Sequence, residues 1–197
     1  MAEKIKFSIL IPAHNEEKYL PKTIEHIKAA SINYPNQVEV IVTANRCKDR
    51  TVEIAEKFGA KVVYEDAKNL AKIRNAGAKA AVGEIIVTVD ADSCVSPNIL
   101  TKIHKALESG KNIGGSVSLK MERMSLGIFF NMYVIFKLGA LFNGLPAGAG
   151  LYWCYRKDFE KIDGFKEAYR VAEDIDFAKR LKKLGKNEKK KFIQKVC

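Results

Sequence analysis

Short apolar runs alternate with helical patterns along the first half of the chain. Four compact, β-prone runs occupy residues 7–11, 38–42, 61–64 and 85–89. Between them, apolar residues recur at helical spacing over residues 20–27, 52–58 and 70–81. Because this alternation is typical of parallel strands joined by helical crossovers, it predicts an α/β fold whose mostly parallel sheet is covered by helices on both faces.

The second half of the chain has a looser order. Ser96 and Pro97 have the form of a helix cap and first helical residue, and the predicted helix ends before Gly110. The remaining expected elements are strands at 115–119 and 151–155, a turn or short helix at 156–162, and a helix from Glu173 to Gly185. The apolar stretch 125–142 predicts a packed amphipathic helix, with an interfacial helix or a lid as the alternative. With no linker or repeat, we expect one domain over residues 1–197.

Charge and cysteine usage narrow the environment and the partners. The net charge of +11 favours polyanionic partners such as anionic lipid or phosphorylated molecules. Basic residues gather between 179 and 195, which predicts a solvated helix face and tail or, alternatively, a membrane or phosphate contact. Phe192 is the only aromatic residue in this stretch that could stack on a base, so no nucleic acid is expected as a partner. Four scattered cysteines without a C-x-x-C pair, and no signal-like apolar run at the start, predict a cytoplasmic protein.

Polar residues follow three of the predicted strands. They lie at 12–16, 44–49 and 90–92, and the carboxyl ends of parallel strands gather at one crevice. If strand geometry continues through Asp90 and Asp92, their spacing of two puts both carboxylates on the same side. Two such carboxylates suit Mg²⁺ or Mn²⁺, with a substrate diphosphate completing the coordination, although a plain surface turn has the same sequence.

Three acidic residues stand at the start of the last predicted helix. Free backbone N–H groups at a helix start stabilise negative charge, so capping explains one of Glu173, Asp174 and Asp176. Capping does not account for all three. A general base is the alternative for this position.

These segments together resemble the family 2 glycosyltransferases, which are inverting enzymes with the GT-A fold. The resemblance covers nearly the whole chain and rests on these stretches: Ser8–Glu17, Asn45–Thr51, Ile73–Gly77, Asp90–Asp92, Gly148–Gly150 and Glu173–Asp174. It implies a Rossmann-like three-layer α/β/α architecture, with a nucleotide-binding half at 1–110 and an acceptor and catalytic half at 111–197. It also implies a nucleotide-diphosphate sugar as donor.

The resemblance further implies roles for individual residues. Pro12, Ala13, Asn15 and Glu16 would bind the nucleoside, and Asn45 stands where the family often has an aspartate that contacts the base. Lys72 and Arg74 would approach the nucleotide phosphates, Asp90 would touch the ribose or the metal, and Asp92 would coordinate the metal. Glu173 would lie against substrate, and Asp174 would be the catalytic base. Family members often take a further metal ligand, commonly His, from beyond the last helix, and residues 186–197 contain none.

The expected reaction is a single displacement by an acceptor hydroxyl at the anomeric carbon, assisted by Mg²⁺ or Mn²⁺. The acceptor is unknown, with lipid-linked or polysaccharide acceptors and a peripheral membrane contact as the expected classes. Two alternatives remain. A haloacid-dehalogenase-like phosphatase also places Asp-x-Asp after an apolar strand. A nucleotide- or membrane-surface-binding domain without turnover could use Phe129, Phe130, Tyr133, Phe136 and the basic tail as its contact face.

Overall fold

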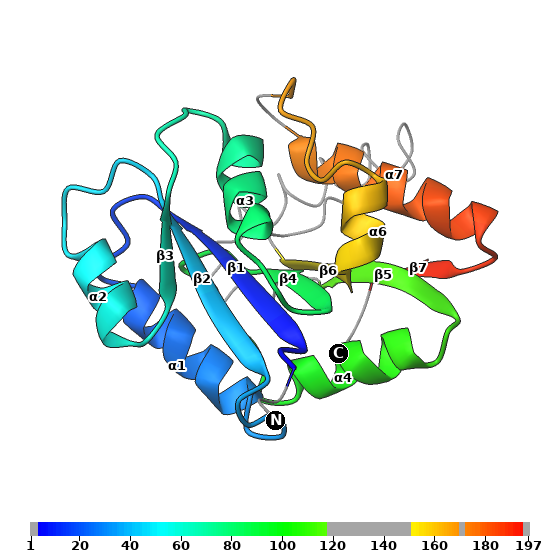
Figure 1. Cartoon of the computed structure of the whole chain (residues 1–197), viewed down its shortest axis with the longest axis horizontal. Helices are drawn as coiled ribbons and strands as arrows, with labels where there is room; N and C mark the ends of the chain where they lie inside the picture. The colour runs from blue at the N-terminus through cyan, green and yellow to red at the C-terminus, as the bar shows by residue number, and fades with distance from the viewer. Residues whose placement is uncertain (1–3, 118–150, 170–171, 195–197) are drawn as a thin grey trace, which may run out of the picture.

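A seven-stranded mixed sheet forms the centre of the protein (Figure 1). The computed structural model describes residues 4–117, 151–169 and 172–194. The strands are β1 (Phe7–Ala13), β2 (Val38–Ala44), β3 (Lys61–Tyr64), β4 (Ile85–Thr88), β5 (Asn112–Val117), β6 (Leu151–Tyr155) and β7 (Lys191–Ile193). Their order in the sheet is β3-β2-β1-β4-β6-β5-β7. β6 runs antiparallel to both of its neighbours and all other pairs are parallel, which confirms the mostly parallel sheet.

Helices cover both faces of this sheet. They are α1 (Leu20–Ala30), α2 (Thr51–Lys57), α3 (Leu70–Lys79), α4 (Ile99–Glu108), α6 (Arg156–Lys161) and α7 (Glu173–Asn187). In Figure 1, α1, α2 and α4 lie below the sheet and α3, α6 and α7 above it. The side chains of β1 alternate accordingly, because Ile9 packs in the cluster with α1 and α4, and Leu10 packs in the cluster with α3 and α7. This arrangement confirms the three-layer α/β/α architecture.

Two helix boundaries differ from those predicted. Asn98, not Ser96, is the N-cap residue of α4, and Ser96 instead accepts a turn hydrogen bond from the Ile99 amide at 3.1 Å. The last helix continues past Gly185 to Asn187. Gly185 is buried, and a Cβ there would meet Ile113 Cγ2 at 2.8 Å, so this glycine allows close packing against β5 and does not end the helix.

The basic tail contains a strand that the sequence did not reveal. β7 pairs in parallel with β5 at the edge of the sheet, so Lys191–Ile193 form a strand where the sequence predicted a tail, and Lys191 remains exposed as expected. The predicted helix at 125–142, including Phe129, Phe130, Tyr133 and Phe136, and the Gly148–Gly150 segment lie outside the described residues. Among the helices that are described, none is both long and apolar enough to cross a membrane.

Candidate active site

The loops that follow β1 and β2 are bound to each other by hydrogen bonds from backbone amides to side chains. Asn15 Oδ1 accepts from the Lys48 amide at 2.7 Å, and the Glu16 amide donates to Thr51 Oγ1 at 2.7 Å. The Glu17 amide donates to Asp49 Oδ2 at 3.0 Å, so α2 begins from a fixed position. Pro12 and Ala13 form the end of β1, where they pair with β2. The structure therefore brings the predicted residues 12–16 and 45 to the same edge of the sheet.

Charge is concentrated at this edge. Burial raises the pKa of the Glu16 carboxyl, and the carboxylates of Asp92, Asp49 and Asp90 raise it further, while His14 opposes them. Burial also acts on Asp49, yet hydrogen bonds from Thr51 and from the Glu17 amide keep the pKa of Asp49 below its ordinary value. The carboxylates of Asp92, Asp49 and Asp90 therefore lie close enough to act on the Glu16 carboxyl.

Asn45 is buried at the end of β2, with 2% of its surface exposed. Its side-chain amide donates to the carbonyl oxygens of Glu65 and Ala67. Its Oδ1 accepts two hydrogen bonds from the guanidinium of Arg46, at 3.1 and 2.9 Å. Asn45 thus lies at the predicted place, and both ends of its amide group are engaged within the protein.

The carboxylates of the Asp-x-Asp pair lie beyond the strand. β4 ends at Thr88, and Asp90 to Asp92 form a turn in which the Ser93 amide donates to the Asp90 carbonyl at 3.0 Å. The condition for aligning the two carboxylates by strand alternation is therefore not met, because a turn follows the strand. Asp92 is exposed and the Asp90 side chain is 36% exposed. Within the described ranges, no group of three or more His, Cys, Asp or Glu side chains could hold a metal ion.

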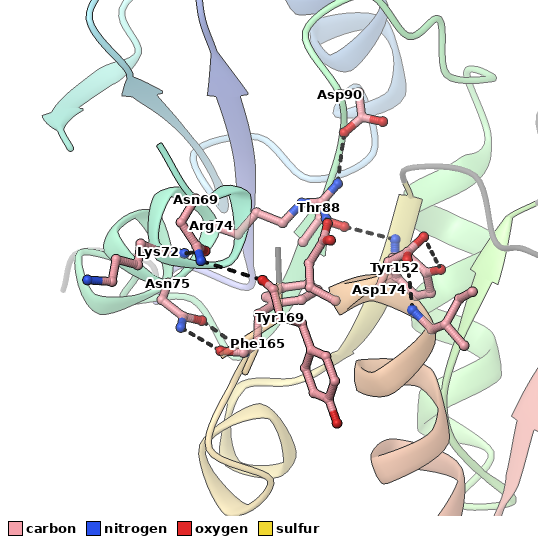
Figure 2. Close-up of polar contacts among 12 residues, drawn as sticks. Asn69, Lys72, Arg74, Asn75, Thr88, Asp90, Tyr152, Phe165, Tyr169 and Asp174 are labelled. Atoms are coloured by element: carbon pink, nitrogen blue, oxygen red, sulfur yellow. Dashed lines mark hydrogen bonds and ion pairs between the residues drawn. The ribbon is translucent and has the colours of Figure 1, made fainter. Parts of the chain in front are cut away.

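Arg74 connects this turn to the start of α7 (Figure 2). Its guanidinium donates to Glu173 Oε1 at 2.8 Å and to Asp90 Oδ1 at 3.2 Å, and lies 5.2 Å from the centre of the Phe165 ring. Arg74 and Glu173 are both buried, with 4% and 7% exposed surface. Lys72 is exposed, and its side chain points away from Asp90 and Asp174 in Figure 2. The two predicted basic residues therefore differ: Arg74 joins the cluster and Lys72 does not.

Asp174 is held beside Tyr152 of β6. The Tyr152 hydroxyl donates to Asp174 Oδ2 at 3.3 Å, and the Ile175 amide donates to Asp174 Oδ1 at 2.8 Å. Burial and the nearby Asp174 carboxylate raise the pKa of Tyr152, so its hydroxyl stays protonated and remains a donor. The N-cap residue of α7 is Ala172, which provides no side-chain cap. Glu173 and Asp176 contact Arg74 and Arg180, whereas Asp174 accepts from a free amide of the first helical turn as well as from Tyr152, so stabilisation by free amides applies to one of the three.

Two asparagines of the α3 region anchor the segment that precedes α7. Asn75 donates to the Phe165 carbonyl at 2.8 Å and accepts from the Phe165 amide at 2.9 Å. Asn69 caps α3 by accepting from the Lys72 amide, and it also donates to the Glu167 carbonyl at 2.9 Å. Sequence reasoning missed the roles of Asn69, Asn75 and Tyr152. An asparagine directly before a helical pattern marks Asn69 as a cap, whereas the inward position of Tyr152 leaves no sequence signal.

Comparison with known proteins identifies the family of this chain. The model of glycosyl transferase family 2 matches residues 8–160. An uncharacterized glycosyltransferase of Haemophilus influenzae is 27% identical over 187 residues, which cover 88% of this chain and 61% of the relative. A dolichol-phosphate mannosyltransferase of Pyrococcus furiosus is 30% identical over 116 residues, covering 55% of this chain and 32% of the relative. The chain thus spans less than two thirds of the length of either relative.

Solved structures show the same fold. The mannosyltransferase PcManGT of Pyrobaculum calidifontis, in complex with GDP-Man and Mn²⁺, has a TM-score of 0.73 at 19% identity, over 98% of this chain and 55% of that one. TarS 1-349 of S. aureus, in complex with UDP, has a TM-score of 0.69 at 22% identity, over 88% of this chain and 54% of that one. At such identities the likeness concerns the fold, and it confirms the GT-A architecture. Since the family model matches more than half of its residues, the protein belongs to glycosyl transferase family 2.

Proposed function

We propose that this protein transfers a sugar from a nucleotide-diphosphate sugar to an acceptor hydroxyl, with inversion at the anomeric carbon. The observation that carries the proposal is the continuous contact Asp90–Arg74–Glu173, which leads from the end of β4 to the residue beside Asp174. This contact supports the proposal because it joins Asp90, a carboxylate suited to a metal ion or the ribose, to the residue that precedes the proposed base. The complexes of PcManGT with GDP-Man and of TarS with UDP support a nucleotide sugar as the donor.

The donor lies along the carboxyl ends of β1, β2 and β4 in this proposal. Pro12, Ala13, Asn15 and Glu16 contact the nucleoside, and Asp90 contacts the ribose or a metal ion. Arg74 holds Asp90 through one oxygen, so the other oxygen remains available to the ligand. Lys72 acts on the phosphates only if its exposed side chain turns toward the crevice. Glu173 acts through Arg74, which keeps the first turn of α7 against the donor site.

Asp90 and Asp92 suit a divalent metal that is shared with the substrate. Two carboxylates supply too few ligands for a closed site, but Mg²⁺ and Mn²⁺ commonly complete their coordination with water and substrate phosphates. Burial raises the pKa of Glu16, and the nearby carboxylates of Asp92, Asp49 and Asp90 raise it further, which supports a cation near this group of carboxylates. When bound, the ion supplies Lewis-acid stabilisation to the leaving diphosphate.

Asp174 accepts the proton of the acceptor hydroxyl as that oxygen attacks the anomeric carbon. The new C–O bond forms while the bond to the diphosphate breaks, and the nucleoside diphosphate leaves with the electron pair. Tyr152 and the Ile175 amide hold the carboxylate oriented for this transfer. A single attack with one base and no protein nucleophile inverts the configuration.

The substitution Asp174→Asn tests the base. Turnover, measured as nucleoside diphosphate released from GDP-mannose and from UDP-GlcNAc, should fall by about 10² to 10⁴, the usual contribution of a general base. Calorimetric affinity for the nucleotide should be unchanged. Asp176→Asn is the matched control, because Asp176 lies one half-turn further along α7 and pairs with Arg180 at 2.6 Å. Near wild-type turnover by Asp174→Asn would disprove the assignment.

The alternatives expected from the sequence make different predictions. The family match does not support a phosphatase of the haloacid-dehalogenase type. A domain that binds nucleotide without turnover would bind the same ligands calorimetrically and release no nucleoside diphosphate. The turnover assay therefore separates this alternative from the transferase.

A row of lysines favours contact with an anionic membrane surface. Lys179, Lys182, Lys183 and Lys186 are exposed on one face of α7, and we call these four residues the basic face. None of them forms an ion pair with another described residue. The opposite face of α7 packs Phe177 and Leu181 into the core. We therefore propose a peripheral position at the cytoplasmic leaflet, where a lipid-linked acceptor would be within reach.

A further inference from the structure

The order of the strands predicts where each part of a bound donor lies. Asp174 contacts β6, Asp90 and Asp92 follow β4, and Arg46 follows β2. Across the sheet these strands stand in the order β2-β1-β4-β6. Neighbouring strands are about 4.8 Å apart, so β2 lies roughly 10 Å from β4, about the span from the phosphate to the base of a nucleoside. With the sugar beside Asp174 and the diphosphate beside Asp90, as proposed above, the base lies by Arg46.

Arg46 is held in an unusual backbone conformation. Its φ of 50° is in the left-handed region, which residues other than glycine rarely adopt. Such conformations persist where the surroundings enforce them, often at ligand sites. Here, Nε and Nη2 of Arg46 both donate to Oδ1 of Asn45, and Asn45 is itself fixed by the carbonyl oxygens of Glu65 and Ala67. The guanidinium is therefore oriented before any ligand binds.

The outer edge of this guanidinium remains available. An arginine carries five N–H donors, and Asn45 uses the one on Nε and one on Nη2. Of the three donors that are left, two lie along the Nη1–Nη2 edge, which presents two parallel hydrogen bonds. Arg46 is exposed and forms no ion pair with the described residues. A partner that uses both of these donors must offer two adjacent acceptor atoms.

Guanine satisfies this requirement best among the four common bases. Its O6 and N7 are adjacent acceptors, and bidentate contact with arginine is the commonest specific way to read them. Adenine places the N6 donor beside N7, and uracil places the N3 donor beside O4. Cytosine offers O2 and N3, but O2 adjoins the glycosidic bond and is crowded by the ribose. Asn45 also leaves no free acceptor for the N3–H of uracil, because Arg46 already occupies its Oδ1.

We propose that Arg46, positioned by Asn45, selects guanine and that the donor is a guanosine-diphosphate sugar. This proposal rests on the proposed function, because it uses the placement of the donor along the strand ends. It gives Asn45 a positioning role in place of the direct contact with the base expected from the sequence. Arg46 becomes the residue that determines specificity for the nucleotide.

Calorimetric titration of the full chain in Mn²⁺ with GDP, UDP, ADP, CDP and 7-deaza-GDP tests the proposal. GDP should bind more tightly than the other natural nucleotides by about 5- to 150-fold, the usual discrimination from one bidentate pair. 7-Deaza-GDP, which lacks the N7 acceptor, should bind more weakly than GDP. Arg46→Gln should weaken GDP and leave UDP unchanged, and Arg46→Lys should not restore GDP, because an ammonium cannot form the bidentate pair.

Arg50→Gln is the matched control, since Arg50 belongs to the same loop and pairs with Glu17. It should leave the order of affinities unchanged. Tighter binding of UDP, ADP or CDP than of GDP by the wild-type protein would overturn the selection of guanine. An equal loss for all nucleotides in Arg46→Gln would also overturn it, because the arginine would then act on phosphate. If no nucleotide binds, the proposed function itself fails along with this inference.

Discussion

The buried ion pair of Arg74 and Glu173 should control the stability of the protein. Their side chains are 4% and 9% exposed and their atoms approach to 2.8 Å. The substitution Arg74→Met leaves the Glu173 carboxylate buried without its partner, which typically costs about 3–5 kcal/mol. The contact of Arg74 with Asp90 adds less than about 1 kcal/mol, because Asp90 is 36% exposed and water screens the interaction.

Urea and thermal unfolding measure this effect. For a chain of 197 residues, each 1 kcal/mol shifts the melting temperature by roughly 2–4 °C, so Arg74→Met should lower it by about 6–20 °C. Adding Glu173→Leu should recover at least about 1 kcal/mol, because the double variant no longer buries an unpaired charge. Arg50→Met is the control, since its ion pair with Glu17 is 73% and 32% exposed. A loss below about 1 kcal/mol in Arg74→Met, or no recovery in the double variant, would refute the reasoning.

Three further outcomes are expected. Tyr152→Phe should lower turnover about tenfold, because the hydrogen bond to Asp174 is lost. The fold should be retained, since the ring still packs on α7. Unchanged turnover would show that Tyr152 has no part in the mechanism. Hydrogen bonds from two lysines hold the pKa of Glu188 at about 2, below its ordinary 4.5. Glu188→Gln should therefore lower the free energy of unfolding by its full amount above pH 4.5, and this loss should vanish as the pH falls through about 2. Urea midpoints of the variant and the wild-type protein that differ equally at pH 6 and pH 2 would contradict this. Replacing Lys182 and Lys183 of the basic face by Glu should abolish co-sedimentation with vesicles containing phosphatidylserine and leave turnover on a soluble acceptor intact, whereas unchanged co-sedimentation would exclude this face.

The apolar periodicity of the chain was sufficient to predict the parallel part of the sheet. Strands that are buried on both faces are mostly apolar: Phe7–Ile11 contains one polar residue, Ser8, and Ile85–Val87 contains none. The grouping of residues 12–16, 45 and 90 followed from the rule that parallel strands end at one edge. By contrast, β7 has only three residues, within a lysine-rich stretch, and its pairing depends on the edge of β5, so local sequence did not predict it.

The contacts within the site were less predictable than its position. Arg74 and Glu173 are 99 residues apart, and their pairing depends on how α7 packs over the sheet. The turn at Asp90–Asp92 could not be distinguished from a continued strand, because both are compatible with the same residues. The roles of Asn45 and Tyr152 depend on which polar atoms are already engaged by neighbours, and only coordinates supply that information.

The paired hydrogen bonds between Asn75 and Phe165 have a thermodynamic consequence for substrate binding. The side-chain amide of Asn75 satisfies both the N–H and the C=O of Phe165, as a neighbouring strand would. Fixing the backbone of one residue costs roughly 1–2 kcal/mol of conformational entropy. The folded protein has already met this cost for Phe165, so the proposed acceptor, bound beside Asp174, would not have to order that residue. In that proposal, the affinity for the acceptor would be set in part by an asparagine that the acceptor need never touch.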